Sequence, residues 1–382
     1  MSRAVPTALL TTYLSDYRIP LFRLLAEREG VEVLAYGRGA RYVPSWFTDL
    51  DGQLERAPFP ARRLDSGVRG ALEVGRRYDA VIAPFSGGSM LPAAFAGSRR
   101  YGRPFVLWAS VWAQPRSVAH AATLPLIRHI YRDADAVVTY GEHVRSFVAH
   151  VRGRDNDVFV APQAVEAELF TRRPEAGELA TFRARNGLGS GPLVLYVGRL
   201  VSEKGIEVLA DAWPRVGSPA TLVLIGDGPL AGRVQALPRA RHLGPLPRAE
   251  LPTAYAAAAL TVVPSIPTPR WREPWGLVCN EAMHQGCPVL ATGAVGAVAG
   301  GLVRHGESGF VVAPGDADAL ASAIDALLAD PQLRRRLGEG GRTAVAPYTY
   351  DAMADAFSHA LRVARARVRT GHSPIEKSAS RS

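Results

Sequence analysis

Lysine is nearly missing from this chain of 382 residues, which has 45 basic residues but only Lys204 and Lys377 as lysines. All other basic residues are arginine, so a lysine inside a loop stands out. Long apolar runs are missing as well, since an uncharged stretch such as residues 80–98 is interrupted by prolines and glycines. Such a stretch makes a poor transmembrane helix, and we expect no segment to cross a bilayer.

Cysteine is equally scarce. Cys279 and Cys287 match no metal-ligand spacing and give no disulfide framework, which suits a reducing cytoplasm. We expect both thiols to be buried and inert. At the N-terminus, Asp16 and Arg18 come before any plausible signal-peptide cleavage site. The expected compartment is therefore the cytoplasm.

The formal net charge is +10, from 45 basic and 35 acidic residues. A basic balance can indicate nucleic acid, a membrane surface or anionic small molecules as partners. No cluster of basic residues with interleaved aromatics occurs, so we expect no nucleic-acid partner. Arginines around the helical pattern at residues 67–78 could hold the protein at the inner face of an anionic membrane, although we favour a solvated helix face. They are Arg62, Arg63, Arg69, Arg76 and Arg77.

Short apolar runs alternate with helical patterns along the whole chain. Fully apolar strands separated by crossover-length segments indicate parallel sheets that are covered on both faces. The sequence therefore predicts an α/β fold of two doubly wound, Rossmann-like domains, joined by a linker near residues 163–176. The expected domains are residues 1–168 and 169–347, followed by a helix at 348–369 and a disordered tail at 370–382. The apolar runs are 4–13, 31–36, 80–84, 105–108, 136–139, 158–161, 193–197, 221–225, 260–264, 288–291 and 309–312.

The loop GRLVSEKG, residues 198–205, directly follows one of these runs. Ligands of open parallel sheets bind outside the carboxyl ends of the strands, so charged residues here are candidates for ligand contact. Arg199 and Lys204 stand close together in the loop, which uses one of the two lysines of the chain. The spacing does not match the P-loop, and solvated surface charges are the alternative.

A second loop, REPWGLVCNEAMHQGCPV at residues 272–289, leads into a helical pattern. We expect this helix to begin directly after Glu273 and to carry Glu281 about two turns inside it. The unpaired N–H groups of its first turn could bind an anion. Glu281 has apolar neighbours, so its carboxylate needs a partner, and a ligand hydroxyl is a better candidate than any basic residue nearby in sequence. A capping acid and a solvated helix residue are the alternatives.

A glycine turn, IGDGPLAG at residues 225–232, contains Gly226, Gly228 and Ala231 in the G-x-G-x-x-A spacing of dinucleotide-binding proteins. The acidic residue expected to hold a ribose is absent from the strand region that follows. We therefore favour a tight strand-to-helix turn, with Pro229 at the first helical position.

Three separate strand-end motifs occur together in residues 190–345. EPWGLVCNEAM carries Glu273 and Glu281 as an E-x7-E pair, GRLVSEKG precedes it, and AVGAVAGGLVRHGESGFVV follows it. Their order and spacing resemble the retaining glycosyltransferases of family 4, also called glycosyl transferases group 1, which have the GT-B fold.

This resemblance implies two Rossmann-like domains that face a central cleft, with the acceptor on the first domain, the donor on the second, and the C-terminal helix returning to the first. Arg199 and Lys204 would grip the donor diphosphate, Glu281 would hold the ribose, and Glu273 would contact the transferred sugar. The implied catalytic residues are Arg199, Lys204 and Glu273. The implied donor-binding residues are Gly198, Gly244, Pro245, Leu246, Gly276, Leu277, Val278 and Glu281, of which Gly244 to Leu246 would pass along the nucleobase.

The activity implied by the resemblance is retaining transfer of a hexose-type sugar from a UDP- or GDP-linked donor to a hydroxyl acceptor. The acceptor would belong to polysaccharide or glycolipid assembly, because DYRIPLF in the first domain resembles a subgroup with such roles. Secondary-metabolite assembly is a further possibility. Arginine, lysine and the helix N-terminus would balance the diphosphate, so we expect no metal and no cofactor. His120 and His143 could serve near the sugar, although a lone histidine is more often structural.

Two other functions remain as alternatives. One is an NAD(P)-dependent oxidoreductase that uses the glycine turn at 226–231, but no hydride-transfer residues are visible. The other is a basic binding module without catalysis, which would not need paired carboxylates beside an anion site.

Overall fold

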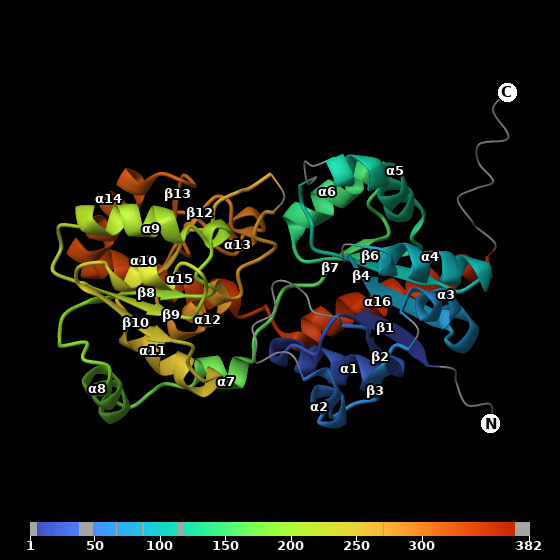
Figure 1. Cartoon of the computed structure of the whole chain (residues 1–382), viewed down its shortest axis with the longest axis horizontal. Coiled ribbons are helices and arrows are strands. Elements are labelled where there is room, and N and C mark those ends of the chain that lie inside the picture. The colour runs from blue at the N-terminus through green and yellow to red at the C-terminus, as the bar shows by residue number, and fades with distance from the viewer. Residues whose placement is uncertain are drawn as a thin grey trace. The chain divides into compact units, whose positions relative to one another are not determined.

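A computed structural model describes residues 6–37, 49–65, 67–85, 88–113, 118–269 and 271–370, and for residues 118–122 it describes the backbone only. The chain divides into two compact units, residues 1–162 with 350–382 and residues 163–349 (Figure 1). From the sequence we placed the first boundary between residues 168 and 169. Of the tail expected at residues 370–382, residues 371–382 lie outside the described part of the chain.

The first unit contains a sheet of seven parallel strands in the order β3-β2-β1-β4-β5-β6-β7. Six of them match apolar runs of the sequence, while β3 is a short polar strand that the apolar pattern missed. The strands are β1 (Thr7–Thr11), β2 (Val31–Ala35), β3 (Ala61–Arg63), β4 (Ala80–Pro84), β5 (Phe105–Ala109), β6 (Ala136–Thr139) and β7 (Val158–Val160).

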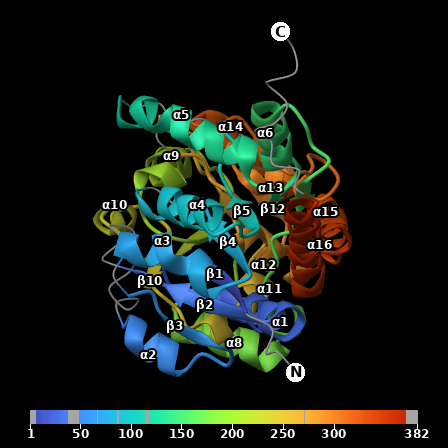
Figure 2. The same ribbon diagram turned by 90° about the vertical axis from the view of Figure 1, so that its right-hand side faces the viewer.

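Helices cover both faces of this sheet (Figure 2). Side chains alternate along each strand, so Leu9 packs on one face while Ala8 and Leu10 pack on the other. One face is covered by α1 (Ile19–Glu29), α2 (Leu50–Glu55) and α16 (Tyr350–Arg369). The other face is covered by α3 (Gly67–Arg77), α4 (Met90–Arg100), α5 (Val118–Asp133) and α6 (Glu142–Arg152).

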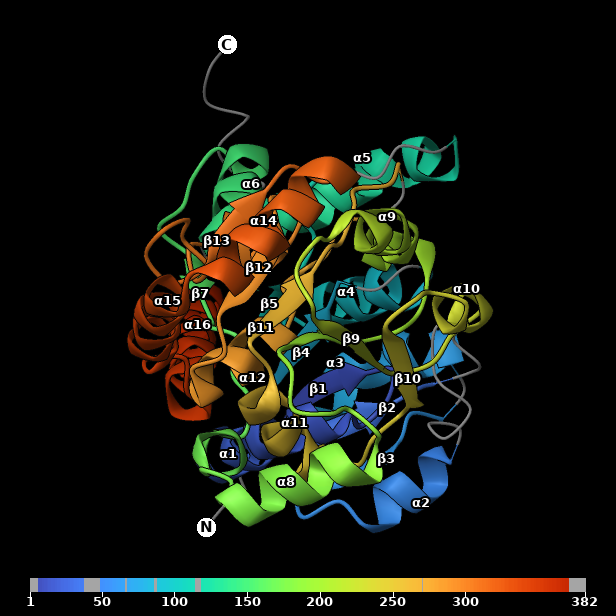
Figure 3. The same cartoon turned by 90° about the vertical axis from the view of Figure 1, so that its left-hand side faces the viewer.

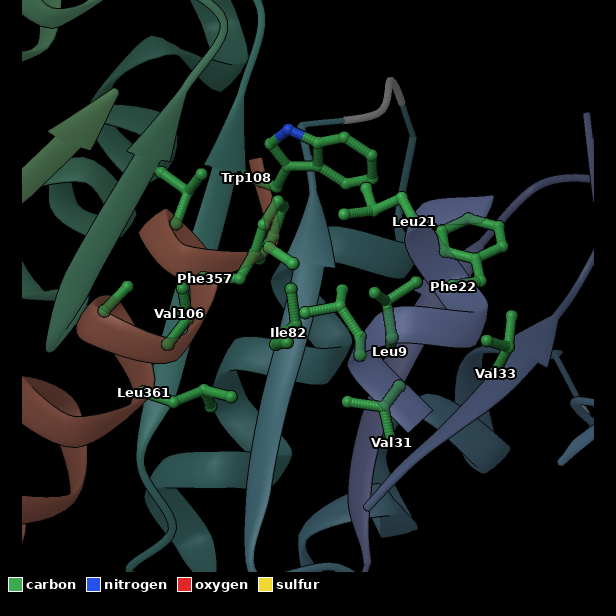
Figure 4. Packing of buried hydrophobic residues seen from close by; sticks show 14 of the residues in the cluster. Leu9, Leu21, Phe22, Val31, Val33, Ile82, Val106, Trp108, Phe357 and Leu361 are labelled. Atoms are coloured by element: carbon green, nitrogen blue, oxygen red, sulfur yellow. The ribbon is translucent and has the colours of Figure 1, made fainter. Parts of the chain in front are cut away.

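The last helix supplies part of the core of the first unit (Figure 4). Phe357 of α16 is fully buried, and its ring meets the edge of Trp108 on β5 at 5.1 Å between centroids. Arg365 pairs with Glu29 of α1 at 3.0 Å. Helix α16 therefore belongs to the first unit, although the whole second unit separates it from the other elements in sequence.

The second unit has a parallel sheet of six strands in the order β10-β9-β8-β11-β12-β13 (Figure 3). The order reverses between β8 and β11, which makes their carboxyl ends a topological switch point. The strands are β8 (Leu193–Val197), β9 (Thr221–Ile225), β10 (Ala240–Gly244), β11 (Leu260–Val263), β12 (Val289–Thr292) and β13 (Phe310–Val312).

Helices also pack on both faces of the second sheet. The apolar core under one face is shared with α9 (Ile206–Ala212), α10 (Ala231–Gln235), α14 (Ala317–Ala329) and α15 (Pro331–Val345). Helices α11 (Leu251–Ala257) and α12 (Val278–Gln285) contact strands β8, β11 and β12. They also pack against each other and against the first two helices of the unit. These two are α7 (Ala167–Thr171) and α8 (Ala176–Arg185), and the short α13 (Gly296–Ala299) follows β12.

Replacing Phe357 by alanine should destabilise the first unit, because it leaves a cavity between α16 and the sheet. We expect the free energy of unfolding to fall by about 3–5 kcal/mol. Arg362→Ala on the exposed side of the same helix is the control and should cost less than about 0.5 kcal/mol. Urea unfolding measures both, and equal effects would contradict the packing role of Phe357.

Candidate donor site

The two charged loops found in the sequence flank the switch point of the second sheet. Residues 198–205 follow β8, and residues 264–273 follow β11 and lead to α12. In open parallel sheets this is the place where ligands bind.

The loop after β8 is held by its own hydrogen bonds. Gly198 has a φ of +151°, and the Tyr196 hydroxyl donates to the carbonyl oxygen of Arg199 at 2.7 Å. The Arg199 guanidinium lies 3.3 Å from the carboxylate of Glu203. Arg199 and Lys204 therefore face different carboxylates, because Lys204 pairs with Glu273.

Glu273 is only 5% exposed, and its carboxylate has partners from different loops. Its Oε2 forms an ion pair with the Lys204 ammonium. The same oxygen accepts a hydrogen bond of 3.0 Å from the Ser265 hydroxyl. The Thr292 hydroxyl donates to the carbonyl oxygen of Ser265, which attaches the end of β12 to this group. Glu273 thus joins the ends of β8, β11 and β12.

Close packing keeps the loops after β8 and β11 together. Gly205 has a φ of +71°, and a Cβ atom there would lie 1.9 Å from the carbonyl oxygen of Pro264. The Lys204 ammonium lies 5.4 Å from the centroid of the Trp271 ring, within the range of a cation–π contact.

The glycine turn after β9 packs against the same loop. A Cβ atom on Gly226 would lie 2.0 Å from the carbonyl oxygen of Gly198, and one on Gly228 would lie 2.4 Å from that of Leu200. These glycines therefore allow two loops to touch. We expected Pro229 at the first helical position, and this was wrong. Helix α10 begins at Ala231, with Leu230 as its N-cap.

Helix α12 begins later than the sequence suggested. Gly276 has a φ of +93°, which no α-helix contains, so Leu277 is the N-cap and Val278 is the first helical residue. The expectation of a helix that begins directly after Glu273 was wrong by four residues. Of the implied donor-binding residues Gly276, Leu277 and Val278, only Val278 belongs to the helix, and the other two belong to the turn before it.

The later start places Glu281 in the first turn of α12, not about two turns inside. Its carboxylate is half-buried and accepts a hydrogen bond of 2.7 Å from the hydroxyl of Tyr255, a fully buried residue of α11. Burial raises the pKa of Glu281, while the Tyr255 hydrogen bond and the positive charge of Arg248 oppose this rise. Sequence reasoning missed Tyr255 as a partner.

The segment expected to pass along the nucleobase lies at the end of β10. Gly244 has a φ of +69°, and its carbonyl oxygen accepts the amide of Gly226 at 2.9 Å. Pro245 and Leu246 follow the strand and lead to Arg248, whose guanidinium lies 3.6 Å from Glu166 and 5.6 Å from the ring centroid of Phe170.

Three groups of the site were missed by sequence reasoning. Ser265 and Trp271 stand in SIPTPRWR, residues 265–272, which connects the apolar run at 260–264 to Glu273. Their place at the carboxyl end of a central strand was a usable signal. Tyr255 gave no such signal, because it lies on a helix and 26 residues before Glu281.

Comparison with known proteins identifies the second unit. The family model of glycosyl transferases group 1 matches residues 180–344. The second unit is a group 1 glycosyltransferase domain.

Two curated proteins similar to this chain carry the names of enzymes. The GDP-mannose-dependent alpha-(1-6)-phosphatidylinositol monomannoside mannosyltransferase of Mycolicibacterium smegmatis is 34% identical over 235 residues, which are 56% of this chain and 59% of that protein. The alpha-D-kanosaminyltransferase of Streptomyces kanamyceticus is 30% identical over 222 residues, 56% of each chain. These alignments span less than two thirds of the length of either relative.

A solved structure extends the likeness to the whole fold. Anabaena HepE in complex with UDP and glucose superposes with a TM-score of 0.76 at 20% identity, covering 94% of this chain and 99% of that one. The predicted fold class, two doubly wound Rossmann-like domains of the GT-B type, is confirmed.

Other polar residues of the chain have structural partners. In the DAD triplets at 133–135 and 316–318, Asp135 pairs with Arg99 at 2.8 Å and Asp316 caps α14. Within the described ranges, no group of three or more His, Cys, Asp or Glu residues could hold a metal ion. None of the described helices is both long and apolar enough to cross a membrane.

The two histidines named from the sequence lie in the first unit. The side chain of His120 lies outside the described part of the chain. The His143 ring meets the edge of Trp112 at 5.1 Å between centroids. Both cysteines, Cys279 and Cys287, are free and buried, and burial raises the pKa of Cys287 to about 12.

The raised pKa of Glu281 predicts a pH-dependent stability difference between wild type and Glu281→Gln. The folded state binds this proton more tightly than the unfolded chain, whose glutamates titrate near about 4.3. The wild type should therefore lose stability relative to the variant as the pH rises from the pKa of the unfolded chain to the raised pKa of the folded protein. Urea unfolding of both proteins between acid and neutral pH checks this, and a difference that does not change with pH would contradict it.

Proposed function

We propose that this protein is a glycosyltransferase that moves a hexose-type sugar from a UDP- or GDP-linked donor to a hydroxyl acceptor. The second unit would hold the donor, and the first unit would bind the acceptor. The observation that carries this proposal is the convergence of Lys204, Glu273 and the N-terminus of α12 at the switch point of a group 1 domain. The names of the relatives support it, since one is GDP-mannose-dependent and one solved neighbour holds UDP and glucose.

The donor diphosphate would lie at the start of α12. Negative charge grows on this group as the glycosidic bond breaks, so fixed positive groups beside it stabilise the transition state more than the ground state. Arg199, Lys204 and the helix N-terminus supply such groups. The proposal therefore needs no metal and no cofactor.

The sugar and the ribose would be held by the two carboxylates. Glu273 would accept hydroxyls of the transferred sugar, and its ion pair with Lys204 places the sugar contact beside the diphosphate contact. Glu281 would hold the ribose diol, while Gly198 and the segment Gly244–Leu246 would border the rest of the nucleotide. For a retaining reaction, the acceptor would attack on the face of the leaving phosphate, whose oxygen helps to take the acceptor proton.

The acceptor side of the proposal covers polysaccharide, glycolipid or secondary-metabolite assembly in the cytoplasm. A glycolipid acceptor would bring the protein to the inner face of a membrane. Helix α3 supports peripheral contact, because Val68 and Leu72 are exposed at 42% and 37% beside exposed arginines on the same helix. A basic helix with exposed apolar residues can bind anionic lipid.

The two alternative functions have less support. In an oxidoreductase the glycines at 226 and 228 would let a pyrophosphate lie close to the backbone. Here the space beside them is filled by the carbonyl groups of Gly198 and Leu200. A basic binding module gives no reason for a carboxylate as buried as Glu273 beside an anion site.

Lys204→Ala should lower turnover by about 10² to 10³ without unfolding the chain, because it removes one stabilising charge from the leaving diphosphate. Arg335→Ala is a matched loss of positive charge on the exposed side of α15 and should leave turnover unchanged. Release of nucleoside diphosphate from saturating donor measures both. Wild-type turnover in Lys204→Ala would remove this residue from the mechanism.

Glu281→Gln should weaken nucleotide binding by about 1–3 kcal/mol, because a neutral acceptor replaces a charged one at the ribose. The 2′-deoxy nucleotide should bind the wild type more weakly, and the variant should lose little further with it. Calorimetry with UDP, GDP and their 2′-deoxy forms completes this cycle. Strictly additive losses would show that Glu281 does not touch that hydroxyl.

A further inference from the structure

Asn280, the residue before Glu281, is fully buried and uses both ends of its side-chain amide. Its Oδ1 accepts the indole N–H of Trp275 at 2.8 Å, and its Nδ2 donates to the carbonyl oxygen of Gln163 at 2.7 Å. Trp275 and Gln163 are buried as well. A buried amide that satisfies two distant groups holds them in one arrangement, because losing either bond would strand a polar group away from water.

The partners of Asn280 lie where the chain passes between the two units. Gln163 is the first residue of the second unit. Trp275 packs on Tyr348, with 5.7 Å between ring centroids, and the second unit ends at Thr349. One side chain therefore connects both crossing segments, directly at residue 163 and through Trp275 at residue 348.

Trp275 also belongs to the turn of the proposed donor site. It stands between Glu273 and Gly276, and its carbonyl oxygen accepts the amide of Ala297 at 2.7 Å. A shift of this turn toward a bound nucleotide would move the indole that Asn280 holds.

The opposite end of α12 is attached to the same incoming segment. Gln285, the last residue of the helix, donates to the carbonyl oxygens of Phe170 and Arg172, both at 2.6 Å. Between the two attachments, Glu281 contacts Tyr255, whose ring lies 6.3 Å from that of Phe170. The segment from residue 163 to 172 thus follows the helix that carries the proposed ribose carboxylate.

We propose that Asn280 is a positioning residue that couples the occupancy of the donor site to the two segments joining the units. It would act through Trp275 and Gln163 and would touch neither the donor nor the reacting atoms. This inference rests on the proposed function, since it requires a nucleotide at the N-terminus of α12.

Amide hydrogen exchange with and without UDP or GDP tests the coupling on the wild-type protein. We expect the nucleotide to slow exchange in residues 273–282 and also in the crossing segments, residues 163–172 and 345–352. Slower exchange at 273–282 with unchanged exchange in both crossing segments would overturn the inference. Absence of any nucleotide binding would overturn the proposed function itself, and the inference with it.

Three variants separate the two arms of the amide. Trp275→Phe keeps a ring but removes the indole donor, Asn280→Asp keeps an acceptor but cannot donate to Gln163, and Asn280→Ala removes both bonds. We expect the first two variants to lose the nucleotide effect mainly at 345–352 and at 163–172, respectively. Full retention of both effects in all folded variants would overturn the inference.

Ser308→Ala is the matched control for a merely structural role. Ser308 is 1% exposed in the same unit and also makes two hydrogen bonds, to Leu302 at 2.6 Å and from Arg304 at 2.9 Å, away from the crossing segments. This control should lose thermal stability but keep the nucleotide effect on exchange. Asn280→Asp should lower kcat about tenfold or more and change KM for the donor less than about threefold. Equal kcat in the control and Asn280→Asp would overturn the positioning role.

Discussion

The buried carboxylate of Glu273 is the group on which the proposed donor site depends. A charge in this position is stable only if its partners stay in place, and here they are the ammonium of Lys204 and the hydroxyl of Ser265. Because the partners come from the loops after β8 and β11, the requirement fixes those loops relative to each other. The contact of Gly205 with Pro264 is a consequence of the same closeness.

Most strands of the fold could be predicted from the sequence. A parallel strand that is buried on both faces has a continuous run of apolar residues, and such short runs are typical of this kind of strand. The strands β3 and β10 escaped this pattern, and both lie at the edge of their sheets. The sequence of β3 is Ala-Arg-Arg, in which Arg62 reaches Glu32 and Arg63 reaches Asp51. An edge strand has only one neighbour and need not be apolar, so composition alone does not reveal it.

Sequence reasoning selected site residues that stand close together in sequence and missed their partners that meet only in space. Arg199, Lys204, Glu273 and Glu281 came from local motifs beside predicted strand ends, and their chemical roles remain proposals. The partner of Glu281 could not be found, since Tyr255 looks like an ordinary apolar helix residue until α11 and α12 are packed together. The start of α12 was misplaced because Gly276 can adopt either a helical or a left-handed backbone, and the sequence does not decide between them.

The return of α16 to the first unit has a consequence for synthesis on the ribosome. Domains usually fold in the order in which they emerge, beginning with the N-terminal one. Here the second unit is complete once Thr349 has been made, whereas the first unit still lacks the helix that covers Trp108 and its neighbours. The nascent first unit therefore carries a sheet face that is uncovered where α16 will pack, during translation of the whole second unit. For this protein, the unit that begins first is the one that is finished last, and protection of that face by a chaperone would matter most during this interval.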